Sequence, residues 1–194
     1  SGLLSGARAH CVGKCTTEGE IDGETQQAWL GAGGRLHDLS PELADKGYAF
    51  RNLGDIDVQT LAGATSTGTH GTGETLQALA AEIQGLRLVT GTGEHIEISA
   101  DQNADWLDGG RVALGALGIL TEIKMQLVER FKLHRQVWPE SHKHTLENAE
   151  RYWQENRNFE FFYIPFSDTN LLITHNVTEE PDTARNDDNS TSAV

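Results

Sequence analysis

Apolar residues recur along the chain with the spacings of both strands and helices. Between residues 119 and 128 they alternate with polar ones, which predicts a half-buried strand. Shorter apolar runs predict further strands at residues 26–31, 83–89, 95–99, 131–137, 159–166 and 170–176. A Thr-Gly-Thr-Gly turn at residues 90–93 joins two of these strands into a hairpin.

Three segments have helical periodicity. Leu36, Leu39 and Leu43 predict a buried helix face that ends near Gly47. Asp101 is a candidate N-cap for a second helix over residues 104–114, and a third helix is predicted over residues 142–156. The side chains that these two helices are expected to bury are Leu107, Val112 and Leu114 in the second, and Leu146, Ala149 and Trp153 in the third.

The order of these elements predicts an α+β fold. The first part should form a mixed, largely antiparallel sheet with flanking helices. After Val128 a new unit of strand, helix and two strands begins, so we expect one domain over residues 1–129 and the beginning of a second α+β domain over residues 130–194. Residues 178–194 are polar and acidic, which predicts a loop or frayed tail.

Charge and hydropathy exclude some classes of function. The formal net charge is −14 in 194 residues, and such a field repels phosphate backbones, so we expect no nucleic-acid partner. The longest apolar stretch, Val112–Leu120, is far shorter than the roughly 20 residues of a transmembrane helix. Ser1 does not read as a native start, so we expect a piece of a longer protein.

The cysteines do not predict a structural site. Cys11 and Cys15 form a short cluster with His10, but one zinc site needs about four ligands and no second cluster follows. Two thiols also cannot build a disulfide-dependent fold. We therefore expect no metal site and two incidental thiols.

The segment over residues 50–75 contains five glycines and few large apolar side chains, which predicts an irregular loop. A long loop inside a compact domain is uncommon unless it has a function. Glycine-rich backbone can form a nest of N–H groups for anionic oxygens. The spacing matches neither the P-loop nor the Rossmann fingerprint. The residues alone leave open a plain surface loop and a backbone-lined ligand site.

Four motifs resemble one enzyme family. The run Asn52–Gly73, NLGDIDVQTLAGATSTGTHGTG, resembles the flavin-binding segment of the vanillyl-alcohol-oxidase superfamily in its aldonolactone oxidase branch. Arg111–Thr121 resembles the second signature of that family. Gly31–Leu39 resembles the strand and helix before the loop, and Phe159–Phe166 resembles an early strand of the substrate domain.

This resemblance implies a PCMH-type FAD-binding subdomain that is followed by the start of a substrate domain. The expected FAD-contacting residues, mostly through backbone, are Asp55, Thr60, Gly63, Thr67, Gly68, Thr69, His70, Gly118 and Ile119. Asp55, which stands where the family commonly has a serine, is expected to lie near the flavin and the substrate. His70 is expected to be structural rather than a catalytic base. The family's N-terminal pyrophosphate loop would precede Ser1, and its catalytic charged residues would follow Val194.

The resemblance further implies an FAD-dependent oxidoreductase acting on the CH–OH group of an aldonolactone or related polyol. Oxygen or another acceptor would reoxidise the flavin. The chain is expected to be cytoplasmic, although the family that it resembles includes both soluble and membrane-associated enzymes. The alternative is a non-catalytic α+β module that binds a small anion or sugar through the Gly/Thr-rich loop.

Overall fold

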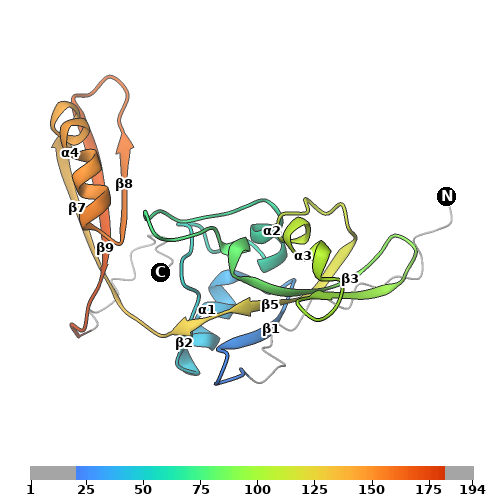
Figure 1. Ribbon diagram of the computed structural model, residues 1–194. Coiled ribbons are helices and arrows are strands. Elements are labelled where there is room, and N and C mark those ends of the chain that lie inside the picture. The colour runs from blue at the N-terminus through green and yellow to red at the C-terminus, as the bar shows by residue number, and fades with distance from the viewer. Residues whose placement is uncertain (1–20, 182–194) are drawn as a thin grey trace.

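A computed structural model of the chain describes residues 21–181 and shows two units that lie side by side (Figure 1). The elements of the first unit are β1 (Gln27–Gly31), α1 (Leu36–Asp45), β2 (Tyr48–Ala49), α2 (Leu61–Ser66), η1 (Leu79–Glu82), β3 (Ile83–Val89), β4 (His95–Ser99), η2 (Ala104–Trp106), α3 (Leu107–Arg111), β5 (Ile119–Gln126) and β6 (Val128–Glu129). Those of the second are β7 (Leu133–Ser141), α4 (His142–Glu155), β8 (Asn158–Tyr163) and β9 (Thr169–Val177).

Three sheets organise the described residues. The main sheet has the order β1-β5-β3-β4, a small ribbon pairs β2 with β6, and the second unit has the order β7-β9-β8. Every pairing between these strands is antiparallel. The α+β class and the largely antiparallel character are confirmed. The chain passes from the first unit to the second between β6 and β7, through residues 130–132.

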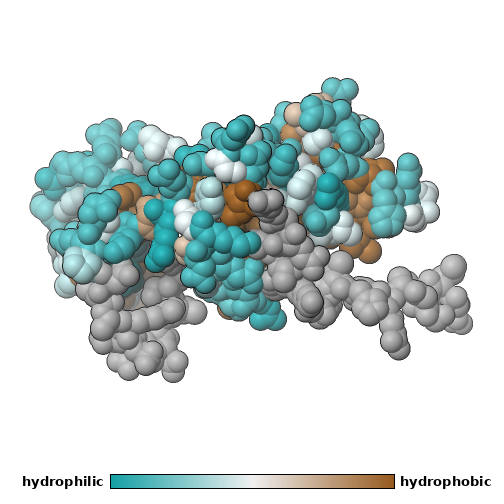
Figure 2. Space-filling view, turned by 90° about the horizontal axis from the view of Figure 1, so that it is seen from below, coloured by the Kyte–Doolittle hydropathy of each residue, from teal (hydrophilic) through white to brown (hydrophobic). Residues whose placement is uncertain are grey.

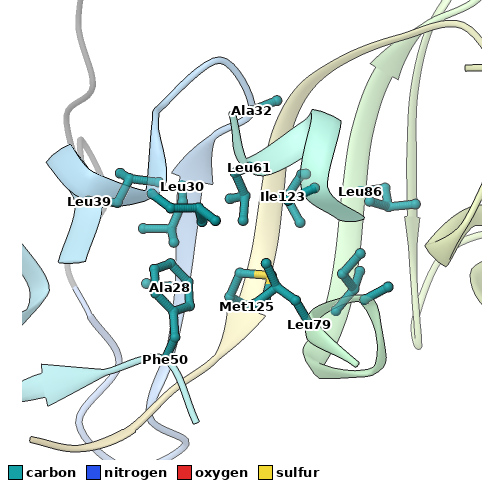
Figure 3. Close-up of a cluster of buried hydrophobic side chains, with 14 of the residues drawn as sticks. Ala28, Leu30, Ala32, Leu39, Phe50, Leu61, Leu79, Leu86, Ile123 and Met125 are labelled. Carbon is teal, nitrogen blue, oxygen red and sulfur yellow. The ribbon is translucent and has the colours of Figure 1, made fainter. Parts of the chain in front are cut away.

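Within residues 21–181, the main sheet has its hydrophobic core on one face. Leu30, Ile123 and Leu86 from three neighbouring strands are fully buried, and they lie beneath the helices (Figure 3). On the opposite face the guanidinium of Arg87 lies 4.0 Å from the Trp29 ring centroid. Arg87 also donates to Glu97 at 2.8 Å and to Glu122 at 3.1 Å. Period-two alternation therefore separates an apolar face from a charged one, as the strand pattern predicts.

The first helix has the face that its periodicity predicts. Leu36, Leu39 and Leu43 of α1 are all buried in the core. The helix ends at Asp45, and Gly47 follows with a positive φ of 87°, a conformation that glycine adopts without strain.

The predicted helix over residues 104–114 is wrong in its length and its burial. A 3-10 turn leads into α3, which ends at Arg111, so Val112 and Leu114 lie beyond the helix and are 46% and 74% exposed. Gly109 and Gly110 weaken the helix, and Leu114 and Gly115 both have positive φ. The helix stops because Val112 leaves the helical conformation, with φ −128° and ψ 62°, and the left-handed pair then turns the chain toward β5.

The prediction for the third helix has the right position but the wrong face. Leu146 and Trp153 of α4 are 55% and 51% exposed, while Thr145 is fully buried and Tyr152 packs inward. Tyr152 contacts Trp138 on β7 and Phe159 on β8, with ring centroids 6.0 and 5.4 Å apart. The prediction chose the most apolar side chains of the helix, and these lie on its outer face. The face that packs against the sheet instead carries a hydroxyl group and an aromatic ring.

Two other expectations change. The segment over residues 50–75 is not irregular throughout, since it contains the short helix α2. The strand predicted to reach Phe166 ends at Tyr163, and Phe166 is fully exposed with a φ of 62° in the turn before β9. The cluster of His10, Cys11 and Cys15 and most of the predicted tail lie outside the described residues.

Candidate functional site

The helix α2 holds the first half of the Gly/Thr-rich segment in a fixed shape. Thr60 is the N-cap, and its Oγ1 accepts a hydrogen bond from the Gly63 amide at 3.1 Å. Leu61 faces the core and is fully buried, while Gly63 and Thr67 are exposed on the outer side. The Thr67 hydroxyl donates to the Gly63 carbonyl at 2.9 Å, so this outer surface is small, polar and ordered.

A tight reversal follows the helix at Gly68. Its φ of 72° is left-handed, and a Cβ there would meet only Val112 Cγ1, at 3.9 Å, among the described residues. The Thr69 amide then donates to the Ala64 carbonyl at 2.9 Å, and its side chain hydrogen-bonds to Gln59. Gly68 is thus a turn with open space beside it, whereas Thr69 is held inward.

The second sequence motif packs against the end of the first. The Leu114 amide donates to the Ser66 carbonyl at 3.3 Å, across 48 residues of chain (114 − 66). Gly118 has a φ of 137°, and a Cβ there would collide with the backbone of Val89. Gly118 therefore lies tightly against the C-terminal end of β3. In the view of Figure 2, apolar patches interrupt a mostly hydrophilic surface. The large apolar side chains that are exposed over residues 104–119 are Trp106, Val112, Leu114 and Ile119.

The remaining predicted residues face the second unit. The His70 side chain is exposed, and its Nδ1 lies 2.8 Å from the Gly71 carbonyl oxygen. His70 opens onto a groove of about 800 Å³ between the loop and the second unit. The lining residues are His70, Gly71, Thr72, Gly73, Leu146, Ala149, Glu150, Trp153, Phe159, Glu160 and Phe161.

Asp55 lies at the same boundary, opposite charged groups that the sequence analysis did not predict. Burial, followed by the nearby carboxylate of Asp55, raises the pKa of Glu160 on β8 above its ordinary value. Burial, followed by the charge of Arg135, lowers the pKa of His175 on β9. Glu160 and His175 share one face of the second sheet, where β9 residues Ile173 and His175 pair with Glu160 and Asn158. No spacing in the sequence marks them, because they come together only through strand pairing.

The predicted residues therefore have unequal roles. Gly63, Thr67 and Gly68 share an open surface beside the second motif, and Asp55 and His70 lie at the other end of the loop. Thr60 and Thr69 direct their hydroxyls into the protein. Contact of any of these residues with a cofactor stays a prediction.

The geometry fits a large ligand that is bound mainly by backbone. The backbone N–H groups of His70 and Gly71 donate to no atom within residues 21–181. The space beside Gly68 is open, and a larger residue at this position would fill part of it. An anionic cofactor needs hydrogen-bond donors, and free N–H groups in glycine-rich backbone bind its oxygen atoms without a lysine or arginine. A heteroaromatic cofactor needs open space beside the backbone, which Gly68 leaves. The described part of the site thus fits FAD, which the motifs imply.

Two family models match different parts of the chain. Residues 13–99 match the FAD binding domain family, and residues 123–193 match the D-arabinono-1,4-lactone oxidase family. The chain is thus similar to FAD-linked aldonolactone oxidases in both of its units. It resembles L-gulono-1,4-lactone dehydrogenase of Mycobacterium tuberculosis, with 40% identity over 84% of this chain and 37% of the relative. It also resembles L-gulonolactone oxidase of Bos taurus, with 32% identity over 88% of this chain and 39% of the relative.

The solved structures support the same fold. A cholesterol oxidase variant from Brevibacterium sterolicum superposes with a TM-score of 0.73 at 20% identity, over 84% of this chain and 34% of that protein. A solvent-stable cholesterol oxidase gives a TM-score of 0.72 at 15% identity, over 84% and 35% of the two chains. In every one of these comparisons, the chain spans less than two-fifths of the length of the protein that it matches.

The raised pKa of Glu160 predicts a pH effect on stability. A carboxyl group whose pKa is higher in the folded state stabilises that state fully below its ordinary pKa, and this contribution is lost as pH rises through the raised pKa. We therefore expect Glu160→Gln to stabilise the protein relative to wild type more at neutral pH than at mildly acidic pH. Urea unfolding at a series of pH values measures this, with the exposed Glu74→Gln as the control. A pH-independent difference would contradict the assignment.

Proposed function

We propose that the protein containing this chain is an FAD-dependent oxidoreductase that oxidises the CH–OH group of an aldonolactone or a related sugar or polyol. Oxygen or another electron acceptor would complete the cycle. The observation that carries the proposal is the meeting of the two flavin-family motifs at Ser66 and Leu114, beside an open left-handed glycine. The names of the relatives support the substrate class, since both are enzymes of gulonolactone.

The residues of this chain would have three tasks. The outer surface of α2 and the turn at Gly68 would hold FAD through backbone groups, and FAD would supply the hydride-accepting chemistry. The loop over residues 112–119 would support the cofactor from the side. Asp55 and Glu160, on opposite sides of the boundary between the units, would bind and orient the hydroxyl groups of the sugar.

The test of this proposal is the visible absorption spectrum of the protein expressed from its complete reading frame, before and after acid precipitation. We expect a flavin spectrum, and bleaching of the flavin when an aldonolactone is added without oxygen. Colour that stays in the acid pellet would indicate covalent attachment. A colourless, folded protein that takes up no added FAD would remove the proposal and favour a module that binds a small anion or sugar.

The surface of α2 gives a sharper test within the same protein. Thr67 is exposed, so Thr67→Trp should leave the fold intact but place an indole where the cofactor is proposed to lie. We expect FAD affinity to fall by about tenfold or more, the equivalent of roughly 1.4 kcal/mol. Thr92→Trp, at the exposed tip of the β3–β4 hairpin, is the control and should bind FAD as wild type does. Equal affinity in both variants would exclude α2 from the cofactor site.

Localisation is a separate proposal. No helix within residues 21–181 is long and apolar enough to cross a membrane. We propose a cytoplasmic enzyme, which fractionation of cells that express the complete reading frame would test.

A further inference from the structure

A small set of buried polar groups joins the two units. The Asn158 side chain at the start of β8 donates to the Thr72 carbonyl at 2.6 Å and to Asn52 Oδ1 at 3.2 Å. Asn52 Nδ2 donates to the same Thr72 carbonyl at 3.2 Å. Asn52 and Asn158 are only 8% and 7% exposed. We call Asn52, Thr72 and Asn158 the asparagine clasp.

In the clasp, both the oxygen and the nitrogen of the Asn158 side-chain amide make hydrogen bonds. Its Oδ1 accepts from Arg157 Nη1 at 2.9 Å, while its Nδ2 makes the two bonds across the boundary. Arg157 also donates to the Arg51 carbonyl at 2.5 Å and lies 4.7 Å from the Phe131 ring centroid. A buried amide with every group satisfied fixes one geometry, because any shift leaves a polar atom without a partner.

Two glycines make the close approach possible. A Cβ on Gly71 would meet the Leu53 carbonyl oxygen and would lie 2.8 Å from Asn52 Oδ1. A Cβ on Gly73 would lie 2.6 Å from the Arg157 carbonyl oxygen, and Gly73 has a φ of 122°. The last two glycines of the motif therefore serve the junction between the units, whereas Gly68 opens onto the cofactor surface.

The clasp lies next to the candidate site on both sides of the boundary. Thr72 is two residues after His70, and Asn158 is two residues before Glu160 on the same face of β8. A rigid joint at this point sets where Glu160 lies relative to Asp55 and the flavin loop.

We propose that the asparagine clasp is a positioning device, which holds the substrate-facing side of β8 in register with the flavin loop. This inference rests on the proposed function. Asn158 is a positioning residue that acts through Glu160 and the loop, and it does not contact substrate itself. The clasp should therefore control the rate of the chemical step rather than the binding of FAD.

The experiment uses the holoenzyme from the complete reading frame and measures anaerobic flavin reduction by an aldonolactone in a stopped-flow instrument. We expect Asn158→Leu, which is close in size but has no polar group, to reduce the limiting rate by about 10- to 100-fold, as small misplacements of reacting groups do. FAD content and flavin absorption should match wild type. Asn158→His keeps a ring N–H near the position of the amide and should recover most of the lost rate.

The matched control is Asn148→Ala. Asn148 lies on α4 in the same unit, and its amide donates to the His144 carbonyl at 2.9 Å without crossing the boundary. Wild-type rates in Asn158→Leu, or equal losses in Asn158→Leu, Asn158→His and Asn148→Ala, would overturn the clasp. A colourless wild-type protein would instead remove the proposed function itself and the positioning role with it, so the two failures are distinguishable.

Discussion

Replacing Leu61 by alanine is expected to lower the free energy of unfolding by about 2–5 kcal/mol, the usual range for a buried leucine. Leu61 has no exposed surface, and it lies between Leu30 of β1 and Ile123 of β5 (Figure 3). No neighbouring loop can fill the resulting cavity, because the flanking side chains belong to paired strands.

The same substitution tests how the core supports the candidate site. Leu61 is the first residue of α2, so its loss should also loosen the outer surface that carries Gly63 and Thr67. Urea unfolding of the apoprotein and FAD titration measure the two effects separately. For the unfolding measurement, Leu114→Ala is the control, since this leucine is 74% exposed and its truncation should change the free energy of unfolding by less than about 1 kcal/mol. A Leu61→Ala protein as stable as the control would show that α2 is not anchored by the core.

Strand alternation and helical periodicity predict most of the first unit from sequence. The leucines of α1, and Ile123 and Met125 of β5, are buried where the periods place them. Ile119 is the exception, because a register shift against β3 interrupts the alternation and leaves this side chain 71% exposed. The predictions for Val112, Leu114, Leu146 and Trp153 are wrong for a shared reason. Large apolar side chains were assumed to be buried, yet all four are between 46% and 74% exposed.

The candidate site also has a part that the sequence predicts and a part that it does not. Thr67, Gly68 and their neighbours could be predicted because the family motif fixes both order and spacing in one short segment. The clasp could not, since Asn52 and Asn158 are 106 residues apart and an isolated asparagine has no recognisable pattern. Glu160 and His175 come from two strands whose register is set only by pairing. Local spacing therefore predicts the loop, and tertiary contacts alone show what the loop faces.

Replacing Gly118 by alanine should destabilise the first unit by about 3 kcal/mol or more, because two costs combine. The φ of 137° is strained for any residue with a Cβ, which costs roughly 1–3 kcal/mol. The new methyl group would also meet the Val89 carbonyl and lie 3.1 Å from Thr90 Cα, and backbone in a sheet cannot move aside.

Two other glycines separate these costs. Gly115 has a φ of 77°, but a methyl group on it would meet no described atom within 4 Å, so Gly115→Ala should show the conformational strain alone. Gly91 has neither feature, and Gly91→Ala should be close to neutral. The free energy of unfolding, measured with urea, should therefore be lowest for Gly118→Ala, higher for Gly115→Ala and highest for Gly91→Ala. If Gly118→Ala were no less stable than Gly115→Ala, Gly118 could not lie tightly against the end of β3, and this contact would not hold the second motif beside α2.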